Sequence, residues 1–148
     1  MLKSYCFAAA ILAAAAMPAF ADGDCGSAPI APAIPTASEF SGKTLDAAAK
    51  ARHETFLQIK VYQSALQPYR ACLKAQDDAD MAAIAEAKSN GAKDKDKIPP
   101  LQDRIAARLI ANNQTVDTEQ QVATEFNTLA QFLAQCAKDS TPSNCPKN

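Results

Sequence analysis

The amino-acid sequence predicts an all-α protein: a long antiparallel helical hairpin of coiled-coil type, with a proline-rich extended N-terminal arm and two disulfides. Two long segments carry apolar residues at alternating steps of three and four, which is the spacing of one helix face. A short charged stretch separates the two segments. Alanine is abundant and tryptophan is absent, a composition that suits closely packed helices better than a thick globular core.

Residues 1–21 have the layout of a secretory signal peptide. Lys3 gives a basic start, residues 7–16 form an apolar run, and Ala19-Phe20-Ala21 matches the small-x-small pattern of a cleavage site. The run is shorter than the roughly 20 apolar residues that a transmembrane helix needs. We therefore expect cleavage after Ala21 and a periplasmic or secreted protein with no membrane insertion, the choice between the two compartments being left open.

Residues 22–43 are predicted to form an extended arm. Pro29, Pro32 and Pro35 recur at every third residue, which places them on one face of a polyproline II helix. Proline also resists the interior of an α-helix and cannot donate a hydrogen bond to a sheet. The arm is either a stiff linker or a segment docked along the helices, and the cysteines considered below favour docking.

The hairpin is expected to occupy residues 44–138, with residues 44–90 as its first helix. Pro68 lies inside this helix, where it removes one hydrogen bond and crowds the preceding turn, so we expect a kink just before it. Two polar residues and a gap near Asp77 interrupt the apolar seam. The predicted seam consists of Leu45, Ala49, Arg52, Phe56, Ile59, Gln63, Leu66, Tyr69, Leu73, Met81, Ile84 and Lys88.

The turn of the hairpin is expected near residues 91–98, which are charged and lack periodicity. It follows Asn90-Gly91, a typical helix stop. Pro99 and Pro100 then suit the first turn of a helix, where a missing N–H costs little.

The second helix is predicted over residues 99–138. Asn112 and Glu119 are polar breaks in its seam. A single buried Asn often fixes the register of paired helices, and simple exposure of Asn112 is the equal alternative. The predicted seam consists of Leu101, Ile105, Leu109, Asn112, Val116, Glu119, Val122, Phe126, Leu129, Leu133 and Cys136.

Four cysteines, Cys25, Cys72, Cys136 and Cys145, remain after the predicted cleavage, and an even number in an exported chain indicates two disulfides. Continuous antiparallel helices would hold Cys72 about 30 Å from Cys136, whereas a disulfide needs Cα atoms within about 7 Å. Cys145 could reach Cys72 only with the whole tail stretched back. The arm is long enough to bring Cys25 to Cys72. We therefore predict Cys25–Cys72 and Cys136–Cys145, the second bridge tying down a tail of residues 139–148.

We find no catalytic, cofactor or metal motif in the sequence. There is no P-loop, dinucleotide fingerprint or nucleophile elbow, and the cysteine spacing is not that of a zinc site. His53 and Glu54 are adjacent on a predicted helix and point about 100° apart, so they do not form a dyad. The acidic residues within 77–80 and 93–97 lack the calcium-loop pattern, and solvated turns are the favoured interpretation. The net charge of −1 gives no electrostatic case for nucleic-acid binding.

Three pieces of the sequence carry a resemblance. They are the proline-rich arm ending in Ile34-Pro35, the segment Tyr69-Arg70-Ala71-Cys72-Leu73, and Val116-Asp117 followed by Val122-Ala123 and Phe126-Asn127. On these pieces the chain resembles a loose set of small exported proteins of Gram-negative bacteria. The resemblance implies a secreted helical hairpin and no established activity, so no catalytic residue is carried over. Pro68 departs from the uninterrupted helix of such proteins.

The expected function is that of a non-enzymatic structural or protein-interaction protein of the cell envelope, with a second copy or another envelope protein as its partner. The alternative is a small periplasmic chaperone-like or inhibitor-type binding module. Aromatic residues at helical spacing could line a peptide-binding groove for such a module, although stripes of this kind more often form a core. These aromatic residues are Phe56, Tyr62, Tyr69, Phe126 and Phe132.

Overall fold

The structure is a computed structural model that describes residues 25–139 and 145–147. The predicted signal peptide and the first residues of the arm lie outside the described residues, as does most of the tail. None of the helices in the described ranges is long and apolar enough to cross a membrane. In order along the chain, the elements are the 3-10 helix η1 (Ala37–Phe40), the helix α1 (Leu45–Ser89), the 3-10 helices η2 (Gly91–Lys93) and η3 (Lys95–Lys97), and the helix α2 (Ile98–Lys138).

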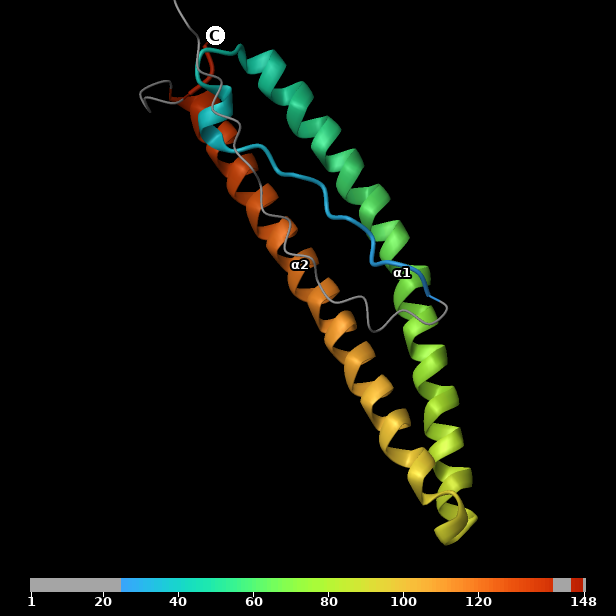
Figure 1. Cartoon of the computed structure of the whole chain (residues 1–148). Coiled ribbons are helices and arrows are strands. Elements are labelled where there is room, and N and C mark those ends of the chain that lie inside the picture. The colour runs from blue at the N-terminus through green and yellow to red at the C-terminus, as the bar shows by residue number, and fades with distance from the viewer. Residues whose placement is uncertain (1–24, 140–144, 148) are drawn as a thin grey trace, which may run out of the picture.

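The two long helices pack antiparallel and form the hairpin that the sequence predicts (Figure 1). α1 and α2 begin and end within one residue of their predicted limits. The turn between them follows Gly91, whose φ of 67° is the left-handed conformation that glycine adopts most easily after a helix. Pro99 and Pro100 lie in the first turn of α2, where the missing N–H groups cost little.

α1 continues through Pro68 without a break, and Figure 1 shows it as a gently curved helix. The Pro68 side chain is exposed, so its ring does not disturb the contact with α2. The missing hydrogen bond is tolerated because packing on both sides of Pro68 holds the helix. Leu66 and Tyr69, its near neighbours, are both buried.

The face of α2 that contacts α1 agrees with the predicted seam at Val122, Leu129, Leu133 and Cys136, and it differs by one residue nearer the turn. Buried residues recur at every seventh position along α2, which is the heptad repeat of a coiled coil. The predicted Leu109 and Val116 are 55% and 44% exposed, and the residues preceding them are buried in their place. The buried heptad positions of α2 are Arg108, Thr115, Val122, Leu129 and Cys136.

α1 shows a similar shift at its ends and agrees with the prediction in the middle. Ala48 and Thr55 are buried instead of the predicted Ala49 and Phe56, and Met81 is exposed. Near the turn, Asp80 takes the buried position in place of Met81 because it pairs with arginines of α2, as described below. Buried as predicted are Ile59, Leu66, Tyr69, Leu73 and Ile84.

The arm is docked along the helices and is not a free linker. Figure 1 shows it running from the middle of α1, between the two helices, to the open end of the hairpin. Pro29 and Pro32 lie against α1, while Ile34 and Pro35 lie against α2. The arm ends in η1, whose Phe40 is 1% exposed and packs with Ala48, Leu129 and Leu133.

The end of the chain returns to the start of α1. The Leu45 N–H donates to the Lys147 carbonyl at 3.0 Å, and the Lys147 N–H donates to the Lys43 carbonyl at 2.6 Å. Thr44 caps the helix by accepting from the Ala47 N–H at 3.2 Å. Tail and cap together satisfy N–H groups that a helix start leaves without partners. The open end of the hairpin is thus closed by main-chain pairing.

Candidate functional site

Two disulfides fix the arm and the tail to the hairpin, and their pairing is the one predicted. Cys25 is bonded to Cys72 and Cys136 to Cys145, with Cα–Cα distances of 5.6 and 5.4 Å. The first bridge joins residues 47 positions apart, and the second joins residues 9 positions apart. In the chain-entropy account, closing the longer loop stabilises the folded state by about 4 kcal/mol and the shorter one by about 2.5 kcal/mol.

A group of four charged side chains, which we name the Arg–Asp cluster, lies between the helices on the turn side of the first disulfide. Arg104 donates to both carboxylate oxygens of Asp80, at 3.1 and 2.6 Å. Arg108 also donates to Asp80, and its Nε donates to Asp77 at 2.7 Å. Arg108 is 5% exposed, so these ion pairs occupy a position of the seam where a coiled coil usually buries an apolar side chain.

This cluster corrects the sequence interpretation of residues 77–80 as a solvated turn. The segment is helical, and Asp80 is buried against α2. Its charge is compensated by arginines 24 and 28 positions away in sequence, which no local pattern reveals. A detectable signal was the spacing, because Asp80 lies seven residues after the buried Leu73.

The pKa of Asp80 is lowered to about 2. The hydrogen bond from Arg104 is the largest cause, and burial, which favours the neutral acid, opposes it. Arg108 adds a further hydrogen bond and a further positive charge. Asp80 is therefore ionised at neutral pH, and its arrangement is that of a structural ion pair rather than an acid–base catalyst.

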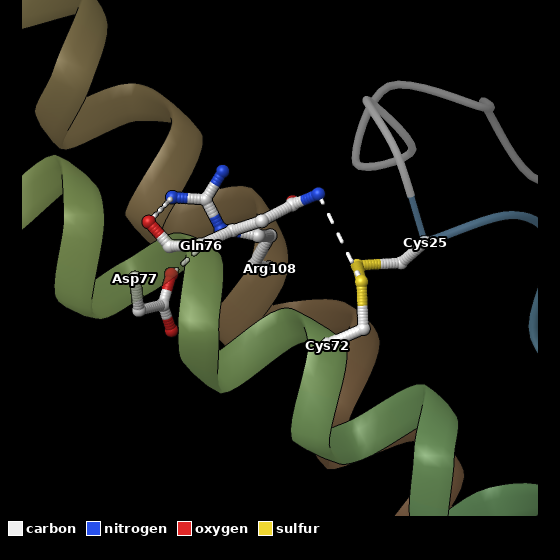
Figure 2. Close-up of a disulfide and its surroundings, with 5 residues drawn as sticks. All are labelled: Cys25, Cys72, Gln76, Asp77 and Arg108. Carbon is white, nitrogen blue, oxygen red and sulfur yellow. Dashed lines mark hydrogen bonds and ion pairs between the residues drawn. A yellow bond between two sulfur atoms is a disulfide. The ribbon is translucent and has the colours of Figure 1, made fainter.

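The cluster adjoins the Cys25–Cys72 bridge (Figure 2). Figure 2 shows Arg108 reaching across from α2 to Asp77 and to the backbone of Gln76, with an Nη2–O distance of 3.4 Å. The Gln76 side chain points the other way and places its Nε2 4.0 Å from the Cys72 sulfur. One turn of α1 thus connects the arm's covalent anchor to the Arg–Asp cluster.

A second polar group crosses the seam near the middle of the hairpin. Arg70 donates to Thr115 through Nε and to Glu119 through Nη1, both at 2.9 Å. Gln63 donates to the same Glu119 at 3.2 Å. These directional contacts set the register of α1 against α2. Asn112 is half-buried, and its backbone carbonyl accepts from the Thr115 hydroxyl of the same helix at 2.7 Å. The cross-helix contact is made by Thr115, three residues after the residue considered for that role.

The five aromatic residues considered for a peptide groove take part in packing. Tyr62 and Tyr69 are buried between the helices, and burial raises the pKa of Tyr62. The rings of Phe56 and Phe126 lie 6.0 Å apart at the edge of the seam. Phe132 packs against the Phe40 core.

Large apolar side chains are instead exposed on the outer faces of the hairpin. One set lies beside the arm, where Ile30, Leu57 and Val61 border a groove together with Pro29 and Pro32. Another set lies on α2 and includes Leu109, Ile110 and Val116. His53 is exposed on α1. Among the described residues no group of three or more histidine, cysteine or acidic side chains is placed to hold a metal ion.

No family model, curated protein or solved structure matches this chain. Its class is therefore defined by its own architecture. It is an antiparallel helical hairpin with an arm held in its groove by one disulfide and a tail held at its open end by another.

Proposed function

We propose that this protein is an exported, non-enzymatic structural or interaction protein of the cell envelope, which presents its outer helix faces to a protein partner. The observation that carries the proposal is the row of exposed apolar side chains on a covalently fixed scaffold. A contiguous patch of exposed apolar side chains often marks a protein–protein interaction site. Two disulfides support an oxidising compartment, as the N-terminal sequence predicts.

The charged side chains between the helices support the same proposal. The arginines and aspartates of the Arg–Asp cluster use their hydrogen-bonding groups on one another. Such pairs give the hairpin a defined register and leave recognition to its outer surface. A scaffold of fixed register keeps its exposed side chains at constant spacing, which a specific partner requires.

Photocrosslinking in cells tests the proposal. A photoreactive residue is placed at Val61 or at Leu109, which are exposed and apolar, and at the exposed polar Gln121 as the matched control. We expect a discrete protein adduct from at least one apolar position and none from Gln121. Absence of any adduct, including one with a second copy, contradicts the proposal. Recovery of the protein in the cytosolic fraction contradicts the exported location.

The groove beside the arm favours a second candidate function, that of a small chaperone-like binding module. Ile30, Leu57 and Val61 would contact an extended apolar segment of a client chain. We expect the protein to suppress aggregation of an unfolded client, and the double variant Leu57→Asp with Val61→Asp to lose that effect. Ile110→Asp, an exposed apolar position elsewhere, is the matched control. Equal suppression by all three proteins argues against the groove.

A further inference from the structure

α2 carries a second apolar stripe beside the residues that contact α1. At about 100° per residue, this stripe lies on the side of the seam where the Phe56 and Phe126 rings meet. The arm lies on the other side, against Thr128 and Phe132. The members follow steps of three and four along the whole helix. We name them the α2 stripe: Ile105, Leu109, Asn112, Val116, Glu119, Ala123, Phe126, Ala130, Ala134 and Ala137.

Both helices expose apolar side chains on this side: α2 exposes Leu109 and Val116, and α1 exposes Phe56, which is 41% exposed. Leu109 is 55% exposed and Val116 44%. The corresponding side of α1 carries Lys60 and the exposed ion pair of Lys74 with Asp78, whose side chains are 74% and 67% exposed. Lys60, Lys74 and Asp78 thus make this side of α1 charged and solvated away from Phe56. Apart from Glu119 and Phe126, which contact α1, the α2 stripe has the pattern of a coiled-coil seam that the hairpin does not cover.

The polar members of the stripe are compatible with a covered face. The Glu119 carboxylate already accepts from Arg70 and Gln63 of the same chain, so its charge is compensated before any partner binds. Asn112 is a single amide within a long apolar stripe. A lone Asn at such a position commonly specifies register and oligomeric state in coiled coils.

Side-chain size along the stripe indicates what covers it. Its first half carries large residues, with Ile105, Leu109 and Val116, whereas its second half consists largely of alanines such as Ala123 and Ala130. Two copies aligned antiparallel would set the large half of each against the small half of the other. Parallel copies would instead set large against large and leave the alanines facing a gap.

We propose that a second copy of this chain covers the α2 stripe, so that two hairpins pair through antiparallel α2 helices about a two-fold axis. From Ile105 to Ala137 the helix advances about 48 Å, and a contact about 10 Å wide buries about 500 Å² on each copy. The total of about 1,000 Å² reaches the lower size of specific interfaces. The inference rests on the proposed interaction function and names its partner.

The size of the protein in solution tests the pairing. Sedimentation equilibrium of the folded, oxidised protein should give a dimer, and Leu109→Glu with Val116→Glu should weaken dimerisation by more than about 100-fold, because a charge would be buried without a partner. Ile110→Glu is the matched control, since Ile110 is 59% exposed and lies on the adjacent face of α2. Circular dichroism checks that all variants keep their helices. A monomer at every concentration overturns the pairing, as does equal weakening by Ile110→Glu.

Crosslinking between differently labelled copies tests the orientation. A diazirine analogue of leucine is placed at Leu109 in a mixture of ¹⁴N and ¹⁵N protein, and linked peptides are identified by mass. Links to residues 123–137 of the other copy support the antiparallel arrangement, and links to residues 105–116 overturn it. A monomer that still forms adducts with another protein in cells leaves the proposed function standing while the inference fails.

Discussion

The two halves of the hairpin hold their helices together by different interactions, apolar packing in one half and ion pairs in the other. In the half toward the open end, the helices bury apolar side chains around Phe40, and the arm covers one side. In the half toward the turn, the buried positions include Asp80 and Arg108, and the described part of the arm begins at Cys25, which is bonded to Cys72. Apolar burial is non-directional and tolerates sliding, whereas paired charges and hydrogen bonds do not. The open end thus gains stability from burial, and the turn end gains a fixed register.

The boundary between the halves is the Cys25–Cys72 bridge. Losing it releases the arm and should cost about 4 kcal/mol in unfolding free energy, the largest effect that we expect. Chemical denaturation of Cys25→Ser with Cys72→Ser measures this. The double variant at Cys136 and Cys145 is the control and should lose less, because its loop spans 9 rather than 47 positions. The opposite order would show that the arm adds little to the open end.

The second largest loss of stability is expected from truncating a core side chain at the open end. Phe40→Ala removes a side chain that is 1% exposed and should cost about 3–4 kcal/mol through lost burial and a cavity. Hydrogen exchange should show that amides of the open end lose protection first. Phe56→Ala, at a ring that is 41% exposed, is the control and should cost much less. Uniform loss of protection along both helices would mean that the halves open together.

Substitutions in the Arg–Asp cluster test the half of the hairpin toward the turn. Arg108→Met leaves Asp77 without its arginine and Asp80 with Arg104 alone, and should cost about 3 kcal/mol. Adding Asp80→Leu to this variant removes the buried charge as well and should recover much of the loss. Denaturation curves of the two variants make the comparison. A double variant less stable than Arg108→Met alone would show that the remaining Arg104–Asp80 pair carries the stability.

Lowering the pH should reduce the free energy of unfolding by a smaller amount than the substitutions above, through Asp80 at the turn end. The folded pKa of Asp80, about 2, lies below its ordinary value of 3.8, so its contribution is fully present above pH 4 and is lost as the pH falls through about 2. We expect about 1–2 kcal/mol of stability to disappear over this range. Asp80→Asn should flatten this part of the pH dependence, measured by thermal unfolding at each pH. Asp78→Asn, at an exposed residue, is the control and should leave this part of the pH dependence as it is in the unsubstituted protein.

The helices could be predicted because local sequence patterns determine them, and the disulfides could be predicted because the length of the chain limits which cysteines can meet. The periodicity of apolar residues and the stop at Gly91 define the helix limits. Chain reach then separates the possible cysteine pairings, since two antiparallel helices hold Cys72 and Cys136 far apart. The docking of the arm followed from the same argument of reach.

The polar residues of the seam, such as Arg108 and Asp80, could not be predicted in this way. Leu109 is more apolar than Arg108, so a pattern of single residues places the leucine in the seam and the arginine in solvent. The arginine is buried because it meets two aspartates from the other helix, and that compensation depends on the register of the pair. The displaced leucine is then exposed on α2 and belongs to the α2 stripe. Phe40 was missed for a related reason, because its burial depends on the arm reaching the open end.

The two bridges also determine how the protein would carry a mechanical load. When force is applied to the two ends of the chain, the tension passes from Cys25 through the disulfide to Cys72. The docked arm and the first part of α1, which lie between these cysteines in sequence, carry no tension. At the other end of the chain, the tension passes from Cys145 through the disulfide to Cys136, and the short loop between these two cysteines carries no tension either. The tension is borne by the segment from Cys72 through the turn to Cys136, which contains the Arg–Asp cluster. Under force, the Arg–Asp cluster and the buried apolar residues beside it, rather than the core around Phe40, would hold the two helices together.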